Sequence, residues 1–283
     1  MNWGVENSIP KGTTLKAEFT RITPVYPCRV YVQWVLHNPT PATTYTFDLY
    51  RSGSAEGPWE SLETDYTDFF CIDSDYTANP TAKTPGLFTL NSIVYYRIVV
   101  KVGTTVVAET IETDGAYQLN QRIRGIRRKL MRDAEIYLRK VTGTHMAVLK
   151  RKRWGEPCTV CQSATGQSIL AKCSSCYGTG IVGGYWTPVY GFGQRTAAAV
   201  EVQPDVSGEL ETHRIQLTML EIPKVEPDDI VVFRDGRRYI IEQVSPTQLR
   251  VTNVHQECVI SELSRSSAVY SITVDPWHSP SWY

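Results

Sequence analysis

Four cysteines near the middle of the chain have the spacing of a tetrahedral metal site. Cys158 and Cys161 form one Cys-x-x-Cys pair, Cys173 and Cys176 form another, and eleven residues separate the pairs. A two-residue gap lets one tight turn aim both sulfurs at one ion, and two such turns supply the four ligands that Zn²⁺ prefers. We therefore expect a structural zinc site. The spacing leaves open a redox Cys-x-x-Cys pair, two disulfides or free thiols.

The residues around these pairs favour a structural metal ion over a catalytic one. Gly178, Gly180, Gly183 and Gly184 follow the second pair and allow the chain to bend close to the ion. Four cysteine ligands leave no open coordination position for a substrate. Because the segment is short and has no large core of its own, we expect its fold to depend on the metal.

The other three cysteines, Cys28, Cys71 and Cys258, are isolated in the sequence. Each lies beside apolar or strand-like residues, so the expected state is a buried, small, free side chain. A disulfide between Cys28 and Cys71 is the alternative.

Sequence motifs of enzyme active sites are absent. The chain has no phosphate-binding loop, no His-Glu-x-x-His and no Gly-x-Ser-x-Gly. Its five histidines are scattered, and the Asp228-Asp229 pair follows Pro227 in a predicted turn, where solvated carboxylates are expected. We therefore expect no catalytic residues and a protein that is not an enzyme.

An amphipathic helix is predicted over residues 117–141, before the cysteines. One helical stripe is formed by apolar residues spaced by three and four: Leu119, Ile123, Ile126, Leu130, Ala134, Tyr137 and Val141. The other faces are basic and offer candidate contacts to DNA or to a partner: Arg122, Arg124, Arg127, Arg128, Lys129 and Arg132. The apolar stripe packs either on its own chain or on a second subunit.

Charge is concentrated in this part of a chain whose net charge is zero. Residues 114–153 carry twelve Lys and Arg against three Asp and Glu, and both flanking parts are mildly acidic. Such asymmetry suggests contact with nucleic acid or with an acidic protein surface. A solvated basic helix without a polyanionic partner is the alternative.

Alternating apolar residues predict strands on both sides of the helix and the cysteines. In the N-terminal part they occupy residues 29–36, with Trp34 among the alternating apolar residues, and residues 45–49. A further strand at residues 94–100 buries either Tyr96, Ile98 and Val100 or the opposite set. In the C-terminal part, strand-like runs surround Arg234-Asp-Gly-Arg237, which predicts a hairpin with a type I′ turn. They are residues 215–220, 229–233, 239–244, 249–254 and 258–263. The aromatic tail, residues 276–283, either anchors a neighbouring subunit or packs back on its own chain.

The N-terminal part resembles a fibronectin type III domain. The resemblance lies in the strand with Trp34, in residues 45–52, and in Leu90 six residues before Tyr96, although Ser92 replaces the usual proline. It implies a tyrosine corner, in which the Tyr96 phenol ties back to the chain. It also implies a binding or spacer module without chemistry of its own.

Later parts resemble structural proteins of tailed bacteriophages. Residues 153–186 look like zinc-ribbon segments of such proteins, and also like one repeat of the zinc domain of DnaJ-type chaperones, whose other repeats and J-domain are missing. Residues 224–239, with 241–246 and 261–263, are similar to head-closure, or stopper, proteins. That resemblance implies a small β-barrel that forms a ring below the portal and closes the DNA channel.

These patterns and resemblances predict a mainly β protein with one long amphipathic helix. The expected units, in chain order, are a fibronectin type III-like β-sandwich (1–113), a basic helix and linker (114–152), a four-Cys zinc ribbon (153–190), a small stopper-like β-barrel (191–275) and the aromatic tail (276–283).

The resemblance leads us to expect a virion protein, assembled in the host cytoplasm, in the phage neck. Expected partners are copies of itself in a six- or twelve-fold ring, portal or adaptor proteins, tail proteins and, non-specifically, packaged DNA. A membrane partner is not expected, since neither an apolar run of about 18 residues nor a signal peptide is seen. Alternatives are a collar, tail or baseplate protein, a cellular zinc-ribbon protein that binds nucleic acid, and an unrecognised enzyme.

Overall fold

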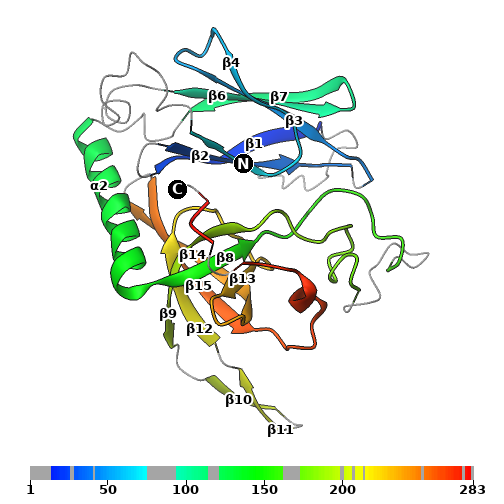
Figure 1. Ribbon diagram of the computed structural model, residues 1–283, viewed down its shortest axis with the longest axis vertical. Helices are drawn as coiled ribbons and strands as arrows, with labels where there is room; N and C mark the ends of the chain where they lie inside the picture. The colour runs from blue at the N-terminus through cyan, green and yellow to red at the C-terminus, as the bar shows by residue number, and fades with distance from the viewer. Residues whose placement is uncertain are drawn as a thin grey trace, which may run out of the picture.

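Strands dominate the computed structural model, in which a two-sheet unit lies above a closed barrel and a helix runs along one side (Figure 1). The predicted class, mainly β with an amphipathic helix, is confirmed. The structure describes residues 14–25, 29–40, 42–74, 94–113, 121–161, 173–197, 201–205, 208–212, 214–249, 252–275 and 278–281.

Two antiparallel sheets make up the N-terminal unit. The first has the order β1 (Lys16–Val25), β2 (Arg29–His37) and β5 (Phe70–Asp73). The second has the order β4 (Glu60–Tyr66), β3 (Thr46–Ser52), β6 (Tyr95–Val102) and β7 (Thr105–Thr113). One apolar core contains residues of both sheets.

Alternation correctly predicted the core side chains of residues 29–36 and 45–49, and of the two sets left open for residues 94–100 the structure buries the one with Tyr96. Trp34 is 2 % exposed and meets Phe47 of the other sheet edge to face, with ring centroids 5.4 Å apart. Tyr96 is fully buried, but its phenol donates to the Asp73 carboxylate on β5 at 2.8 Å. The resemblance predicted a hydrogen bond from Tyr96 to the main chain, but the phenol instead bonds to a side chain of the first sheet. Leu90 lies outside the described residues.

The barrel closes in the order β12–β15–β14–β13–β8–β9. Its strands are β8 (Thr144–Leu149), β9 (Val189–Ala197), β12 (Arg214–Leu220), β13 (Ile230–Phe233), β14 (Arg238–Leu249) and β15 (Thr252–Glu262). Apolar side chains from these strands, among them Leu217, Phe233 and Ile260, fill the interior. β8 comes from residues that the sequence analysis assigned to the linker, so the cysteines lie in a long connection between two barrel strands.

Two local expectations for the barrel are wrong. Residues 249–254 and 258–263 do not form separate strands, because β15 runs from Thr252 to Glu262 without interruption. The turn after Phe233 is not type I′, because only Gly236 has a positive φ, +77°. Asp235 instead accepts a hydrogen bond from the Arg237 amide at 3.0 Å, as in a type I turn followed by a left-handed glycine.

Helix α2 (Gln121–Tyr137) continues into a π-helical turn, η3 (Leu138–Thr142). Its buried side chains are Arg127, Met131, Glu135 and Leu138, which lie on a different face from the predicted apolar stripe. Four members of that stripe are exposed: Ile126, Leu130, Tyr137 and Val141. The helix therefore packs on its own chain, but not through the side that its apolar spacing indicated.

An ion pair explains this rotation of the helix. Arg127 donates to Glu221 at 2.8 Å, and both side chains are at most 5 % exposed. Glu221 also accepts from the Thr23 hydroxyl of β1 at 2.8 Å, so helix, barrel and first sheet meet at one carboxylate. Satisfying this buried charge determines which side of α2 faces inward.

A shared apolar cluster joins the N-terminal unit to the barrel. Tyr31, Phe69 and Phe70 come from the first unit and its adjoining turn, Leu138 from η3, and further members from β9, β12 and the residue Ile222. The Tyr31 and Phe70 rings stack with centroids 5.5 Å apart. The two units therefore pack as one body rather than as separate domains on a linker.

Two peripheral segments complete the fold. The short helix η4 (Ala268–Ser271) covers the outside of the barrel, and β10 (Glu201–Asp205) and β11 (Gly208–Thr212) form a separate two-stranded ribbon that projects from it (Figure 1). In the tail, Ser281 exchanges hydrogen bonds of 2.9 and 3.1 Å with Tyr190, on which His278 stacks. The described part of the tail thus packs back on β9.

Candidate metal centre

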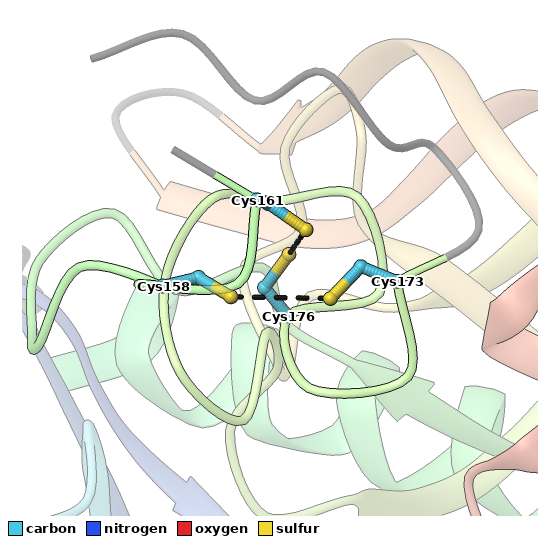
Figure 2. A group of neighbouring side chains, drawn as sticks. All are labelled: Cys158, Cys161, Cys173 and Cys176. Atoms are coloured by element: carbon cyan, nitrogen blue, oxygen red, sulfur yellow. Dashed lines mark hydrogen bonds between the residues drawn. The ribbon is translucent and has the colours of Figure 1, made fainter. Parts of the chain in front are cut away.

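The four predicted cysteine ligands converge in the connection between β8 and β9 (Figure 2). Their sulfur atoms all lie within 4.8 Å of one another. The Cys158 and Cys173 sulfurs are 3.9 Å apart, and those of Cys161 and Cys176 are 3.5 Å apart. The most exposed of the four, Cys173, is only 6 % accessible. The sequence thus correctly predicted which cysteines come together.

These sulfur separations fit a tetrahedral thiolate site. Four sulfurs at about 2.3 Å from a central Zn²⁺ are about 3.8 Å from each other, whereas a disulfide bond is about 2.05 Å long. All four cysteines are free thiols. The cluster therefore has the composition, burial and size needed to hold one metal ion.

Local backbone hydrogen bonds shape the two turns that carry the ligands. In the first, the Cys161 amide donates to the Cys158 carbonyl at 3.3 Å. In the second, the Tyr177 amide donates to the Cys173 carbonyl at 2.8 Å, and Tyr177 itself has a φ of +52°. Each turn aims its pair of sulfurs at the common centre.

Further hydrogen bonds hold the two turns together. The Cys158 amide donates to the Gly180 carbonyl and the Val182 amide to the Glu156 carbonyl, both at 2.8 Å. Gly184 lies directly behind the second pair at a φ of +60°, and a β-carbon there would be 2.6 Å from the Cys176 carbonyl oxygen. Glycine is required at this position both for its backbone angle and for the space.

The thiols differ in acidity in the absence of metal. A hydrogen bond with Cys161 lowers the pKa of Cys173 to about 6, and the same contact raises the pKa of Cys161. Elsewhere, burial raises the pKa values of Cys71 and Cys258 to about 12, so these thiols stay protonated at neutral pH. Both are free and buried as expected, and Cys28 lies outside the described residues.

Asp229 positions the chain where it enters this connection, which corrects the expectation of a solvated Asp228-Asp229 pair. Asp229 is fully buried and accepts from Lys150 Nζ and the Arg151 amide, each at 2.9 Å, and from the Glu226 amide at 2.8 Å. Burial raises its pKa, and Lys150 opposes that shift. Only Asp228 is exposed, where it pairs with Arg151 at 2.8 Å.

Two tryptophans attach the connection to the N-terminal unit, and the sequence did not indicate this role. The Trp154 ring lies 5.3 Å from Trp186, which in turn lies 6.1 Å from Phe69. A cleft of about 380 Å³ beside them contains Asp68 and Lys152. Burial raises the pKa of Asp68 and lowers that of Lys152, which lies over Trp186. These contacts fix the orientation of the connection that carries the four cysteines.

The six candidate basic residues do not share one environment. Arg122, Lys129 and Arg132 are exposed on α2. Arg127 is buried against Glu221 and, in this chain, is not available to DNA or to a partner. The side chains of Arg124 and Arg128 lie outside the described residues.

Comparison with known proteins gives no relative from which a function could be taken. No protein-family model matches the chain, and no curated protein is similar to it at a significant level. In the part of the chain that the structure describes, no helix is long and apolar enough to cross a membrane. Any functional conclusion therefore depends on the site and the fold.

Proposed function

We propose that this protein is a non-enzymatic structural component of a tailed-bacteriophage particle, forming a ring in the neck between portal and tail. The observation that carries the proposal is the closed six-stranded barrel. Its β13–β14 hairpin contains residues 230–239, part of the stretch that resembles head-closure proteins. A rigid, fully closed barrel has no free sheet edges and is suited to repeat around a symmetry axis.

In this proposal the four-cysteine cluster is a structural Zn²⁺ site of the zinc-ribbon type. Cys158, Cys161, Cys173 and Cys176 would hold the ion, which would supply cross-links in a connection with little apolar core of its own. The four thiolates would leave no position open for a substrate. The ion would thereby fix a loop that faces a neighbouring subunit.

The N-terminal unit is proposed to be a fibronectin type III-like sandwich that decorates or spaces the ring. Support comes from its sheets of three and four antiparallel strands around a common core, with Trp34 buried between them. Exposed Arg122, Lys129 and Arg132 would offer salt-dependent attraction to packaged DNA or to an acidic neighbour.

Native mass spectrometry of the full chain, with metal analysis, tests this proposal together with pull-down of the portal and tail proteins encoded by the same genome. We expect one zinc ion per chain, a closed ring, and capture of at least one of those proteins. A monomer that captures neither protein would refute the neck assignment. Strong salt-dependent DNA binding by such a monomer would favour the cellular zinc-ribbon alternative.

A further inference from the structure

The ribbon formed by β10 and β11 is a separate sheet with acidic residues, which we call the arm. Its strands pair with each other from Glu201–Thr212 to Asp205–Gly208 and belong to no other sheet. Residues 201–212 contain four acidic residues, Glu201, Asp205, Glu209 and Glu211, and no Lys or Arg. Because an isolated two-stranded ribbon is marginally stable in water, this arm needs a surface to rest on.

Helix α2 with η3 carries a surface of opposite charge that is also apolar. Ile126, Leu130, Tyr137 and Val141 are 41 to 70 % exposed and, at spacings of four, seven and four, share one side of the helix. Exposed basic residues flank them: Arg122, Lys129, Arg132, Arg139 and Lys140. We call these nine residues the helix stripe. Such an exposed apolar row with charged flanks is typical of a protein contact.

We propose that the acidic arm of one copy of this chain docks on the helix stripe of the next copy. This inference rests on the proposed ring. By the register of the arm, Glu209 and Glu211 share one face and Glu201 and Asp205 the other, so either face offers two negative charges. The stripe offers five positive charges beside its apolar row, of which Arg132 already pairs with Asp133 at 3.5 Å. The two surfaces are different, so the contact is heterologous and propagates around a ring instead of closing a dimer.

The arm docks through a face rather than by adding a strand to a sheet. Pro204 in β10 has no amide hydrogen, which weakens the hydrogen-bonding edge of that strand. The stripe is helical and offers no sheet edge. In Figure 1 the arm extends away from the body of its own chain, beyond the barrel, as an arm that reaches a neighbour must.

Deletion of the arm tests the contact, because the barrel closes without β10 and β11. β9 and β12 already pair next to the arm, with Ala197 opposite Ile215, so residues 198–214 can be replaced by a two-residue Asn-Gly turn that keeps this register. We expect the full chain to self-associate in a salt-dependent way, by native mass spectrometry and sedimentation over a range of concentrations. The deletion variant should be monomeric with unchanged metal content.

Charge reversal tests the pairing of the two surfaces. Glu209→Lys with Glu211→Lys in the arm, and separately Lys129→Glu with Arg132→Glu in the helix stripe, should each raise the apparent dissociation constant at least about a hundredfold. An equimolar mixture of the two variants should form one-to-one complexes, since the unchanged arm of the helix variant then meets the unchanged helix stripe of the arm variant. Glu56→Lys with Glu63→Lys, exposed elsewhere, is the matched control and should associate normally.

The outcomes separate this contact from the proposed function. Rings that persist after arm deletion, or a mixture that fails to associate, would overturn the arm-to-stripe contact while leaving the neck assignment standing. A parent chain that is monomeric at every concentration would also overturn the contact. The neck assignment would then be decided by capture of portal and tail proteins alone.

Discussion

The backbone conformation of residues around the four-cysteine cluster helps to position the sulfur atoms. Cys173 and Cys176 lie in a turn that bends back at Tyr177, and Gly184 passes close behind it. Because Gly184 lies next to the Cys176 carbonyl, a larger residue at position 184 would displace the turn that carries Cys173 and Cys176. The spacing of the cysteines predicted which residues come together. The need for glycine at position 184 could not be predicted from it, because that need arises from a close approach to Cys176, eight residues earlier.

Gly184→Ala should weaken metal binding. The added β-carbon would meet the Cys176 carbonyl oxygen at 2.6 Å, in addition to about 1–2 kcal/mol for a left-handed alanine. Gly236→Ala is the matched control, since its φ of +77° carries a similar conformational cost and nothing lies within 4 Å of the new atom. Competition with a chromogenic chelator should show weaker metal retention for the first variant alone. Equal retention in both would contradict the role of the close approach.

Removal of the metal should loosen the connection between β8 and β9 without opening the barrel. The four cysteines form their own small cluster, whereas the barrel interior is filled by residues such as Leu217 and Phe233. After chelation, hydrogen exchange should accelerate at residues 158–161 and 173–184 and stay slow in β12 and β15. Cys176→Ser should reproduce this pattern.

Cys258→Ala is the control for the metal experiment, because it removes a buried thiol of the barrel core. It should lower stability by about 1 kcal/mol and leave one metal ion per chain. Unchanged exchange at the four-cysteine cluster after metal removal would show that the turns fold without an ion.

At the scale of elements, helix α2 shows how a buried charge overrides apolar periodicity. Spacing alone favoured an inward face with Ile126 and Leu130, yet both are more than 40 % exposed. Arg127, Met131 and Leu138 face inward instead, because Glu221 is buried at the junction and needs a cationic partner. The apolar side of the helix is thereby left exposed.

Arg127→Met should destabilise the protein by about 3–5 kcal/mol, because it leaves the Glu221 carboxylate buried with less compensation. Arg237→Met is the matched control: Arg237 is 51 % exposed and 3.5 Å from Glu262, so its loss should leave stability nearly unchanged. Urea unfolding of both variants measures the difference. Similar midpoints for the two would mean that the buried ion pair does not orient the helix.

Local patterns therefore predicted elements better than they predicted how the elements meet. Period-two alternation correctly indicated β2 and β6 and the burial of Trp34, because one strand face determines that pattern. In β6 it left open whether the set with Tyr96 or the opposite set is buried, and the structure buries Tyr96. The entry of β8 into the barrel and the burial of Asp229 depend on partners about 80 residues away. No local period carries that information.

At the scale of the whole molecule, the two units share a core that neither has alone. Tyr31, Phe69 and Phe70 pack with Leu138 of η3 and with Phe192 of β9. The Gln33 side chain adds polar ties, since its carbonyl accepts from the Lys224 amide at 2.9 Å and its amide donates to the Lys224 carbonyl at 3.2 Å. An interface that is both apolar and hydrogen-bonded resists relative motion of the units.

Unfolding should accordingly be a single cooperative transition. Phe69→Ala would remove an almost fully buried ring that contacts Phe70 and Trp186, at a cost of about 3–5 kcal/mol. Because that ring belongs to the shared core, the variant should move the whole calorimetric transition to lower temperature rather than split it. Val99→Ala, in the N-terminal unit but outside the shared core, should produce a smaller shift of the same single transition. Two resolved transitions in the parent, of which Phe69→Ala moves only one, would mean that the sandwich-like unit and the barrel fold independently despite their shared apolar cluster.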